Sequence, residues 1–523
     1  MALQAGAQGW TDALNFSDND YLGTARSVGM GNAMTAVGGD LGSLTFNPAG
    51  SAVASYSQFT ITPGLSFSTV TAQGSYGDGF EDVYKTRKGR MGLPNFGAII
   101  AYDTRNQRGL RRVTFGIVGN VTRDYTNKLR ASGTNSSTTL AGSLASQADG
   151  FNTDVLNDGY YQGNMPSWEC MVGWKGGLFD ELNGHYVGLT ESLLDTPNHD
   201  IVLTDKINQY YGLERSGSKY DLLMNFGLDF NDKFFLGANI GITTLNFRNN
   251  ETRSEEAIAG IDYGNDFQSL RMRSALTDDG TGVYAKIGFI ARPFSGFRIG
   301  GAVQTPTVIQ VHEGYQLEGS SMAENIKMSE TSPWDEWYYN VVSPWRANLG
   351  IAYTIGKFGI LSADYEFTDY GTMRIKPAYG DEYDYDFSDA NLDIKDFLGP
   401  VHAIRLGAEI KPDPALALRV GYNLTTGAQY NTLADGNRVV SLTRDERFDQ
   451  LRTAVSFGVG YSSPGSFFAD FALRFQYLPN EYFTPYYYYY RENGVQYTDT
   501  VVTPEICGQS ALCNALLTLG WRF

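Results

Sequence analysis

The sequence predicts an all-β fold: a transmembrane antiparallel β-barrel of about fourteen strands, with an N-terminal hatch, or plug, inside its lumen. Three observations predict it. Apolar residues alternate with small or polar ones along most of the chain, short connections alternate with long ones, and the first fifty-odd residues show no alternation. Because a strand places successive side chains on opposite faces, alternation gives each strand one face suited to lipid and one suited to a wet interior.

The composition excludes several other classes of protein. Charged residues make up 19% of the 523 residues and aromatic residues 14%, which is too few charges and too many aromatics for a disordered chain. No run approaches the ~18 apolar residues of a membrane-spanning helix. The net charge of −17 argues against nucleic acid as a partner, because phosphate backbones attract basic proteins.

The alternation is clearest in the middle of the chain. Every second residue from Tyr220 to Phe230 is apolar, and after Asn231–Asp232 the pattern resumes from Phe234 to Ile242. A soluble sandwich also alternates, but its apolar face would not carry aromatic residues so regularly near the strand ends. We therefore expect fourteen strands, which start near residues 54, 94, 111, 219, 233, 280, 297, 338, 358, 400, 415, 450, 467 and 514.

The connections predict how the barrel lies in a membrane. Short connections such as Asn231–Asp232 alternate with long ones, which we place at 72–93, 122–218, 246–278, 310–336, 371–399, 426–449 and 479–514. This is typical of an up-and-down barrel with tight periplasmic turns and long outer loops. In the longest loop, 122–218, we expect short helices at 183–194 and 203–211. We interpret the acidic stretch 380–393 as a solvated outer loop rather than a Ca²⁺ site, because it lacks EF-hand spacing.

Residues 1–53 are predicted to form the hatch, and residues 54–523 the barrel. The segment GTARSVGMGNAMTAVGGDLGSLTFNPAG is rich in small residues, which suits a compact irregular plug with closely packed backbone. A barrel of this size has room for such a plug. Its apolar residues either form a small core that holds the plug in the barrel or line a slot for an apolar ligand: Val28, Met30, Met34, Leu41, Leu44 and Phe46.

The segment from Tyr21 to Ala54 closely resembles the hatch of the long-chain fatty-acid transporter (FadL) family, which includes toluene channels and outer-membrane protein P1. Asn47-Pro48-Ala49 matches the hatch tripeptide of that family. Residues 234–242, 297–307 and 360–370 resemble its strands, and the terminal LGWRF resembles the barrel-assembly signal. The resemblance implies a monomeric, non-enzymatic, fourteen-stranded barrel in the outer membrane of a Gram-negative bacterium, with membrane lipid, lipopolysaccharide and the barrel-assembly machinery as partners.

The resemblance also implies a function, the passive uptake of hydrophobic small molecules, above all long-chain fatty acids. The outer loops capture the ligand, which passes the hatch and leaves sideways through a gap at a kinked third strand. Release into lipid spares an apolar ligand the cost of entering water. Two alternatives stay open. One is a heme-type receptor, which the four scattered histidines disfavour, and the other is a non-transporting barrel that serves as a secretion partner or surface-attachment protein.

Two short motifs are candidates for the gate. The third strand reads VTFGIVGNV, and its Gly116, Gly119 and Asn120 lie mid-strand, where glycine often marks a bulge or bend. They either give the hatch steric room or form the lateral opening. Asn47, Pro48 and Ala49 make a rigid turn, since Pro48 fixes its own φ and lacks an N–H. That turn ends the hatch, sets its closed conformation, or does both.

Inward-facing charges are candidates for the lumen. The arginines are Arg346, Arg405, Arg419, Arg452 and Arg474, and the carboxylates on the same face are Asp364, Glu366, Glu409 and Asp470. We expect these charges to pair with one another, because charges away from bulk water need partners. One of the arginines is alternatively a site for a carboxylate headgroup.

The remaining chemistry-bearing residues are few. Cys507 and Cys513 lie six residues apart, and we predict a disulfide between them in an exported protein, while Cys170 has no evident partner. No CxxC pair, clustered histidines or catalytic set occurs, so we predict no metal, no cofactor and no enzyme activity. The N-terminus MALQAGAQGW is not a signal peptide, and we expect a mature form with an added Met1.

Overall fold

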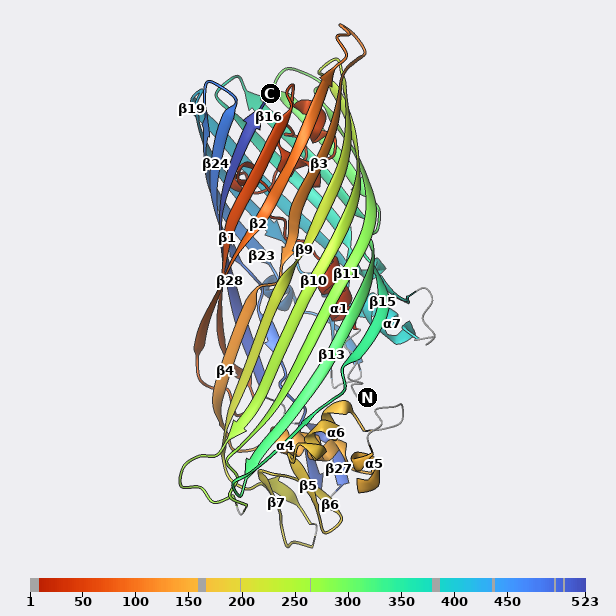
Figure 1. The fold of residues 1–523 in the computed structure, drawn as a ribbon, viewed down its shortest axis with the longest axis vertical. Helices are drawn as coiled ribbons and strands as arrows, with labels where there is room; N and C mark the ends of the chain where they lie inside the picture. Colours follow the sequence, from red (N-terminus) through yellow and green to blue (C-terminus); the bar gives the residue numbers. More distant parts are fainter. Residues whose placement is uncertain are drawn as a thin grey trace.

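The computed structural model describes residues 9–158, 166–197, 199–263, 265–378, 386–434, 438–492, 495–501 and 504–523. Its strands form a closed antiparallel barrel (Figure 1). The barrel has fourteen staves, by which we mean positions around its circumference, each filled by one strand or by two consecutive strands. The first strand, β1 (Gln58–Tyr76), pairs with both β2 (Tyr84–Asp103) and the last strand, β28 (Glu505–Arg522), so the sheet closes on itself. The predicted fold class and strand number are confirmed.

The staves between these follow one another around the barrel. Some are single strands: β9 (Ile207–Phe230), β10 (Phe234–Glu256), β11 (Ser269–Ala291), β19 (Pro400–Asp413), β20 (Leu416–Thr425) and β23 (Arg452–Ser462). Others are interrupted and consist of two strands: β3 (Leu110–Asp124) with β4 (Asn127–Asn135), β12 (Phe297–Gln304) with β13 (Val308–Ala323), β15 (Asp335–Val342) with β16 (Arg346–Ile355), β17 (Gly359–Asp369) with β18 (Arg374–Pro377), and β24 (Phe467–Tyr477) with β25 (Glu481–Phe483).

The two ends of the barrel differ. Short turns join the strands at one end, which lies at the top of Figure 1, and long segments join them at the other. We call these the short-turn end and the long-loop end. Strands reach much further toward the long-loop end than the sequence predicts, because β10 and β11 pair without interruption from Phe234↔Ala291 to Glu256↔Ser269. Twenty-three residues span about 75 Å, more than twice the ~30 Å hydrocarbon core of a bilayer. Beyond that core, neither face of a strand needs apolar residues, so alternation fades while the strand continues.

The segment 122–218 contains more strand than predicted. The helices predicted at 183–194 and 203–211 are wrong: these residues hold β6 (His185–Gly188), β7 (Glu191–Leu193) and the start of β9. Asn183 and Gly184 both have positive φ, which makes a tight hairpin turn between β5 (Phe179–Leu182) and β6. The helices lie elsewhere in the segment, as α4 (Leu140–Gln147), α5 (Thr153–Asn157) and α6 (Trp168–Lys175).

A lobe of short elements covers the long-loop end. A small sheet there joins β7, β8 (Ile201–Leu203), β26 (Tyr489–Glu492) and β27 (Val495–Val501). Tyr486 and Tyr488, from the tyrosine run of the sequence, are buried in its core with α4 and α6. Three further elements lie on neighbouring loops, β21 (Asn431–Ala434) with β22 (Arg438–Ser441), α7 (Ser388–Phe397) and α8 (Arg444–Asp449). Part of the acidic stretch, residues 380–385, lies outside the described residues.

The outer surface of the short-turn half is apolar. On β9, Met224 and Phe226 are exposed, while Asp221, Asn225 and Asp229 are buried on the inner face. The other strands repeat this arrangement, with exposed Ile100, Phe115, Ile117, Ile240, Ile287, Leu349, Ile351, Leu406, Val420, Phe457, Phe471 and Leu517. This belt is the surface that a bilayer requires. Within the described residues, no helix combines the length and apolarity needed to cross a membrane.

The N-terminal segment lies inside the barrel (Figure 1). It contains α1 (Trp10–Ser17), α2 (Ala25–Gly29), the 3₁₀ helix η1 (Leu41–Thr45) and α3 (Gly50–Val53). Inward-facing glycines of the wall allow its backbone to approach closely. A Cβ on Gly237 would lie 2.3 Å from the backbone of Pro48, and one on Gly421 would lie 1.9 Å from the amide nitrogen of Gly31. The wall therefore needs glycine where the hatch rests on it.

The predicted disulfide is wrong. Cys507 and Cys513 are both free and lie on the same strand, β28. Six residues along an extended strand are about 20 Å apart, whereas a disulfide needs Cα atoms within about 7 Å. Cys170 is also free and buried in α6, and burial raises the pKa of its thiol well above the usual value.

Candidate functional site

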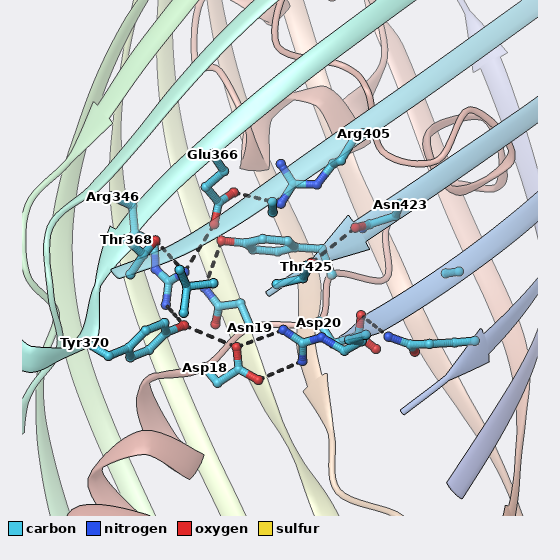
Figure 2. Close-up of a pocket in the computed structure, with 16 residues that line it drawn as sticks. Asp18, Asn19, Asp20, Arg346, Glu366, Thr368, Tyr370, Arg405, Asn423 and Thr425 are labelled. Carbon is cyan, nitrogen blue, oxygen red and sulfur yellow. Dashed lines mark hydrogen bonds and ion pairs between the residues drawn. The ribbon is translucent and has the colours of Figure 1, made fainter. Parts of the chain in front are cut away.

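A polar cavity lies between the hatch and the wall, on the long-loop side of the hatch (Figure 2). The hatch segment Asp18–Tyr21 forms one side, and inward-facing residues of β16, β17, β19, β20, β23 and β24 form the other. The free volume is about 20 Å³, so the groups around it are packed nearly to contact. Its lining includes three of the predicted arginines, Arg346, Arg405 and Arg452.

Ion pairs organise the wall side of the cavity. Glu366 on β17 accepts from Arg346 on β16 at 3.2 Å and from Arg405 on β19 at 2.8 Å. Nearer the short-turn end, Arg419 on β20 donates to Glu409 and to Asp470, both at 2.6 Å. These residues are the pairs that the inward charge pattern predicts. Each is nearly inaccessible to solvent, so removal of one partner would leave a buried charge uncompensated.

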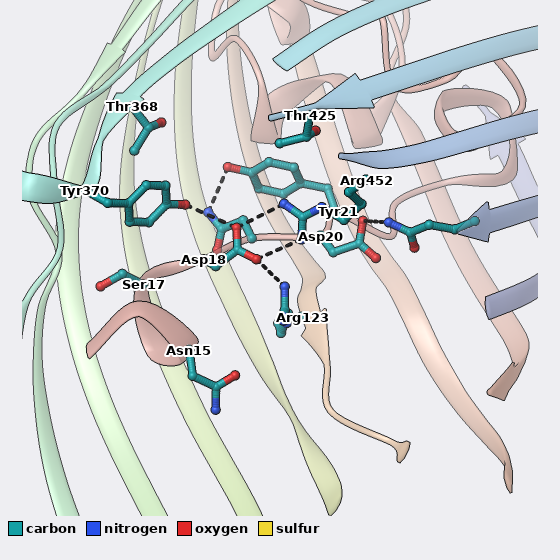
Figure 3. A network of polar contacts seen from close by, with 12 residues as sticks. Asn15, Ser17, Asp18, Asp20, Tyr21, Arg123, Thr368, Tyr370, Thr425 and Arg452 are labelled. Carbon is teal, nitrogen blue, oxygen red and sulfur yellow. Dashed lines mark hydrogen bonds and ion pairs between the residues drawn. The ribbon is translucent and has the colours of Figure 1, made fainter. Parts of the chain in front are cut away.

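The remaining predicted arginines pair with the hatch instead. Arg452 on β23 grips the Asp18 carboxylate through two nitrogens, at 2.7 and 3.1 Å, and Arg123 on β3 contacts the same carboxylate (Figure 3). Arg474 on β24 donates to Asp20 at 2.5 Å. Burial alone would raise the pKa of Asp18, but Arg452 and Arg123 hold it well below its usual value. Asp18 is therefore an ionised carboxylate in a cationic clamp.

Cations also hold the end of helix α1, directly before Asp18. The buried ammonium of Lys219 on β9 donates to the carbonyl oxygens of Phe16 and Asp18, both at 2.6 Å. Arg346 donates to the carbonyl oxygen of Ser17 at 2.5 Å. The carbonyls at a helix C-terminus carry partial negative charge and lack helical partners, so cations stabilise them.

Helix α1 itself lies in an apolar cluster. Phe16 is 1% exposed, and its ring centroid lies 6.0 Å from that of Phe247 on β10. Trp10 packs against Phe397 of α7 at 5.7 Å. Around them the cluster continues through Tyr125, Leu245, Leu276, Ile309, Val311, Tyr339, Val341, Met373 and Ile375. We call this apolar cluster the chamber, and the cations around Asp18, Arg452 and Arg123, the clamp. The two adjoin each other, and the N-terminal segment of the protein fills both.

The wall is interrupted beside this site. β2 and β3 pair from Asp103↔Arg112 to Asn95↔Asn120, and their ladder ends there. From that point the hatch replaces β2 as a partner of β3: the amide of Leu22 donates to the carbonyl oxygen of Val121 at 3.0 Å, and that of Asp20 to Thr122 at 2.7 Å. We call this break the seam. The β3–β9 register also shifts between Val121 and Arg123. The interruption therefore follows directly after the predicted Gly119 and Asn120.

Two aromatic rings cover the outer face of the seam. Phe96 on β2 and Tyr220 on β9 stack with centroids 6.1 Å apart, across the position of Gly119. A Cβ on Gly119 would lie 2.4 Å from the Tyr220 hydroxyl and 2.6 Å from the Phe96 ring. Gly119 therefore makes room for these aromatic rings. The prediction that it gives steric room to the hatch is wrong for this residue. Gly116 is less confined, with its nearest neighbour, Ile99, at 3.2 Å.

Side chains cross the wall where β2 lacks its partner. Lys88 on β2 donates to the carbonyl oxygen of Arg215 at 2.9 Å, and Arg90 donates to that of Gly217 at 2.7 Å, both on β9. Asn120 ties the seam to the hatch, because its side-chain amide donates to the Thr45 hydroxyl at 2.8 Å. The break in the β2–β3 ladder is thus bridged by side chains instead of backbone hydrogen bonds.

The hatch tripeptide is pinned to the wall. The Asn47 amide donates to the carbonyl oxygen of Thr35 at 2.7 Å and to that of Phe289 on β11 at 2.8 Å, and its own oxygen accepts from Ala49 at 3.1 Å. The carbonyl oxygen of Pro48 accepts from Asn225 on β9 at 3.0 Å. These contacts both close the turn and attach it to the wall. The tripeptide can therefore end the hatch and also set its closed conformation.

The apolar hatch residues pack as core. All six candidates, Val28, Met30, Met34, Leu41, Leu44 and Phe46, are at most 2% exposed and contact one another or the wall. None of them lines the polar cavity or the two cavities described next. This geometry gives no support to the hypothesis that these residues line a slot for an apolar ligand.

Two further hollows flank the hatch region. One, of about 270 Å³, lies at the short-turn end; its charged lining residues are Arg26 and Asp40 of the hatch and Arg292, Arg298, Glu409, Lys411, Arg419, Asp470 and Arg522 of the wall. The other, of about 550 Å³, is an apolar groove on the outer face of β9, β10, β11, β12 and β16, within the exposed belt. Neither hollow shares a lining residue with the chamber around α1.

Sequence reasoning missed the hatch side of the site. Asp18 and Asp20 lie in an SDND stretch that matches no motif, and the expected pairing considered wall residues alone. The alternation could have predicted Lys219, because it lies an even number of residues from Asp221, Asn225 and Asp229 and so faces inward on the same strand. Arg123 lies past the register shift in β3, where alternation no longer predicts direction.

Fold and site together define a plugged fourteen-strand β-barrel. No protein-family model and no curated protein matches the sequence. Solved structures share the fold. A Pseudomonas aeruginosa FadL homologue aligns with a TM-score of 0.51 and 12% identity, over 96% of this chain and 99% of its own. The Pseudomonas putida toluene transporter TodX aligns with a TM-score of 0.50 and 11% identity, over 97% of this chain and 100% of its own. The resemblance predicted from the hatch is confirmed at the level of the fold.

Proposed function

We propose that this protein is a channel in the outer membrane of a Gram-negative bacterium for the passive uptake of hydrophobic compounds, with long-chain fatty acids as the main class. The observation that carries the proposal is the seam, where the β2–β3 ladder ends beside the hatch. Phe115 and Ile117, just before the seam on β3, are more than half exposed within the apolar belt. An apolar ligand that leaves there enters lipid without crossing water.

The preference for a fatty acid over a neutral hydrocarbon rests on charge. Arg346, Arg405 and Arg452 line a cavity that adjoins the apolar chamber around α1. Arginine binds carboxylates through paired hydrogen bonds, so this arrangement suits a molecule with one carboxylate and one long apolar tail. Support for hydrophobic uptake in general comes from the fold, which is shared with a toluene transporter and a FadL homologue.

Growth on a fatty acid tests the proposal. The gene is expressed in a Gram-negative strain that lacks its own fatty-acid channel, with oleate as sole carbon source and toluene uptake as a parallel measurement. We expect oleate growth to be restored, and a Gly119→Leu variant, whose side chain displaces the Phe96–Tyr220 pair, to restore it poorly. A folded protein that restores neither oleate growth nor toluene uptake would refute the channel. Toluene uptake alone would refute the fatty-acid preference.

A further inference from the structure

We propose that Asp18 and helix α1 are a built-in occupant of the ligand site, which an incoming long-chain monocarboxylate displaces. This inference rests on the proposed function and specifies its binding site. The Asp18 carboxylate receives two hydrogen bonds from Arg452, at 2.7 and 3.1 Å, one from the Tyr370 hydroxyl at 3.2 Å, and a contact from Arg123. A free carboxylate in the same position would receive the same set.

The apolar half of the occupant is α1. Its eight residues extend about 12 Å from the clamp. Ala13 and Phe16 are at most 1% exposed within the chamber, and Trp10 and Leu14 pack against it. A carboxylate at one end and an apolar body at the other are the two recognisable parts of a fatty acid. The chamber and the clamp are therefore complementary to such a ligand, and the chain covers both with its own atoms.

The two ends of α1 are held unequally. At the C-terminal end, Lys219 and Arg346 donate to three successive carbonyls. At the N-terminal end, the buried carboxyl of Asp12 faces Glu313 on β13, which repels it, and Arg215 on β9, which attracts it. Asp278 on β11 lies against the same Glu313, with Arg248 as an opposing charge. Among the described residues no cation of the wall forms an ion pair with Asp12, whereas Asp18 is paired with Arg452 and Arg123, so α1 is held more weakly at its first turn than at Asp18.

Displacement of Asp18 would act on the seam. Only Asn19 separates Asp18 from Asp20, whose amide donates to the carbonyl oxygen of Thr122, and Leu22 completes the contact with Val121. These hydrogen bonds replace β2 at the break in the wall. A ligand that takes the clamp therefore pulls at the hatch segment that lies along the seam, so capture and release are coupled through one segment of the hatch.

Binding to the purified full-length chain in dodecyl maltoside tests competition. We expect Asp18→Asn, which removes the internal carboxylate at nearly constant size, to bind oleate about tenfold more tightly than the unaltered protein. Oleyl alcohol, which lacks the carboxylate, should show no such gain. Asp20→Asn is the matched control, because it loses one ion pair of the same segment but leaves the clamp occupied. Equal gains for both variants would indicate loosening alone and overturn the inference, as would unchanged or weaker oleate binding by Asp18→Asn.

A reversible lock tests the coupling to the seam. Leu22→Cys and Val121→Cys are combined with Cys170→Ala, Cys507→Ala and Cys513→Ala, since opposed residues of an antiparallel bridge have Cα atoms close enough for a disulfide. Oxidation should abolish oleate uptake, and reduction should restore it. Uptake that is equal in both states would overturn the coupling. Failure of the unaltered protein to take up oleate would instead refute the proposed function, while the binding comparison would still decide whether Asp18 competes.

Discussion

Gly421→Ala should unseat the hatch without harm to the barrel. Gly421 faces inward on β20, and the added Cβ would lie 1.9 Å from the amide nitrogen of Gly31 and 2.5 Å from the carbonyl carbon of Met30. Ordinary contact begins near 3.4 Å, so the hatch backbone must retreat by 3.4 − 1.9, or about 1.5 Å. Both neighbours are backbone atoms, which cannot rotate away. Overpacking of this kind costs about 1–3 kcal/mol, a factor of roughly 5 to 150 in hatch docking.

Ion conductance across a planar bilayer measures the effect. The unaltered protein should be nearly silent, whereas Gly421→Ala should show discrete conducting steps as water enters beside the displaced hatch. Gly92→Ala is the matched control, because its Cβ would meet nothing within 4 Å. The temperature at which the barrel unfolds on a gel should be the same for all three, since β20 keeps its ladders. Equal conductance from Gly421→Ala and Gly92→Ala would refute the account of the wall glycines as hatch supports.

Three further predictions concern other parts of the molecule. Gly119→Leu should reduce uptake of oleate and toluene several-fold while the barrel still folds, and normal uptake would show that the Phe96–Tyr220 cover is not on the exit route. Burial and Glu313 raise the pKa of Asp12 to about 7 when α1 is docked. When α1 is undocked, Asp12 has its ordinary pKa near 4, so between about pH 4 and 7 the carboxyl is ionised in the undocked state and still protonated in the docked state. Docking of α1 should weaken over that range, and an alkyl sulfonate, ionised throughout, should bind more tightly at pH 8 than at pH 5. Asp12→Asn should reduce the difference, and an unchanged difference would implicate another group. Finally, Cys507 and Cys513 should both react with iodoacetamide after unfolding without reductant, and a mass that shows neither modified would restore the disulfide.

The wall could be predicted from the sequence, whereas the site could be predicted only in part. Alternation on β9 and β10 identifies inner and outer faces because lipid imposes one side-chain type on every second residue. The same rule gives no information beyond the bilayer, where Asn183–Gly184 turn a predicted helix into a hairpin. Export and a six-residue spacing together suggested a disulfide between Cys507 and Cys513, but an extended strand keeps them apart. Asp18 escaped prediction because its partners, Arg123 and Arg452, come from strands more than 300 residues apart in sequence.

The seam has a consequence for how the molecule is made. Val121 and Thr122 obtain backbone partners from Leu22 and Asp20, which precede the first strand in the chain. A barrel that closed around an empty interior would leave these carbonyls without the backbone donors that Leu22 and Asp20 supply. The N-terminal residues are thus needed to complete the cylinder as well as to block it. We therefore expect their insertion to come before, or together with, the pairing of β1 with β28 during biogenesis.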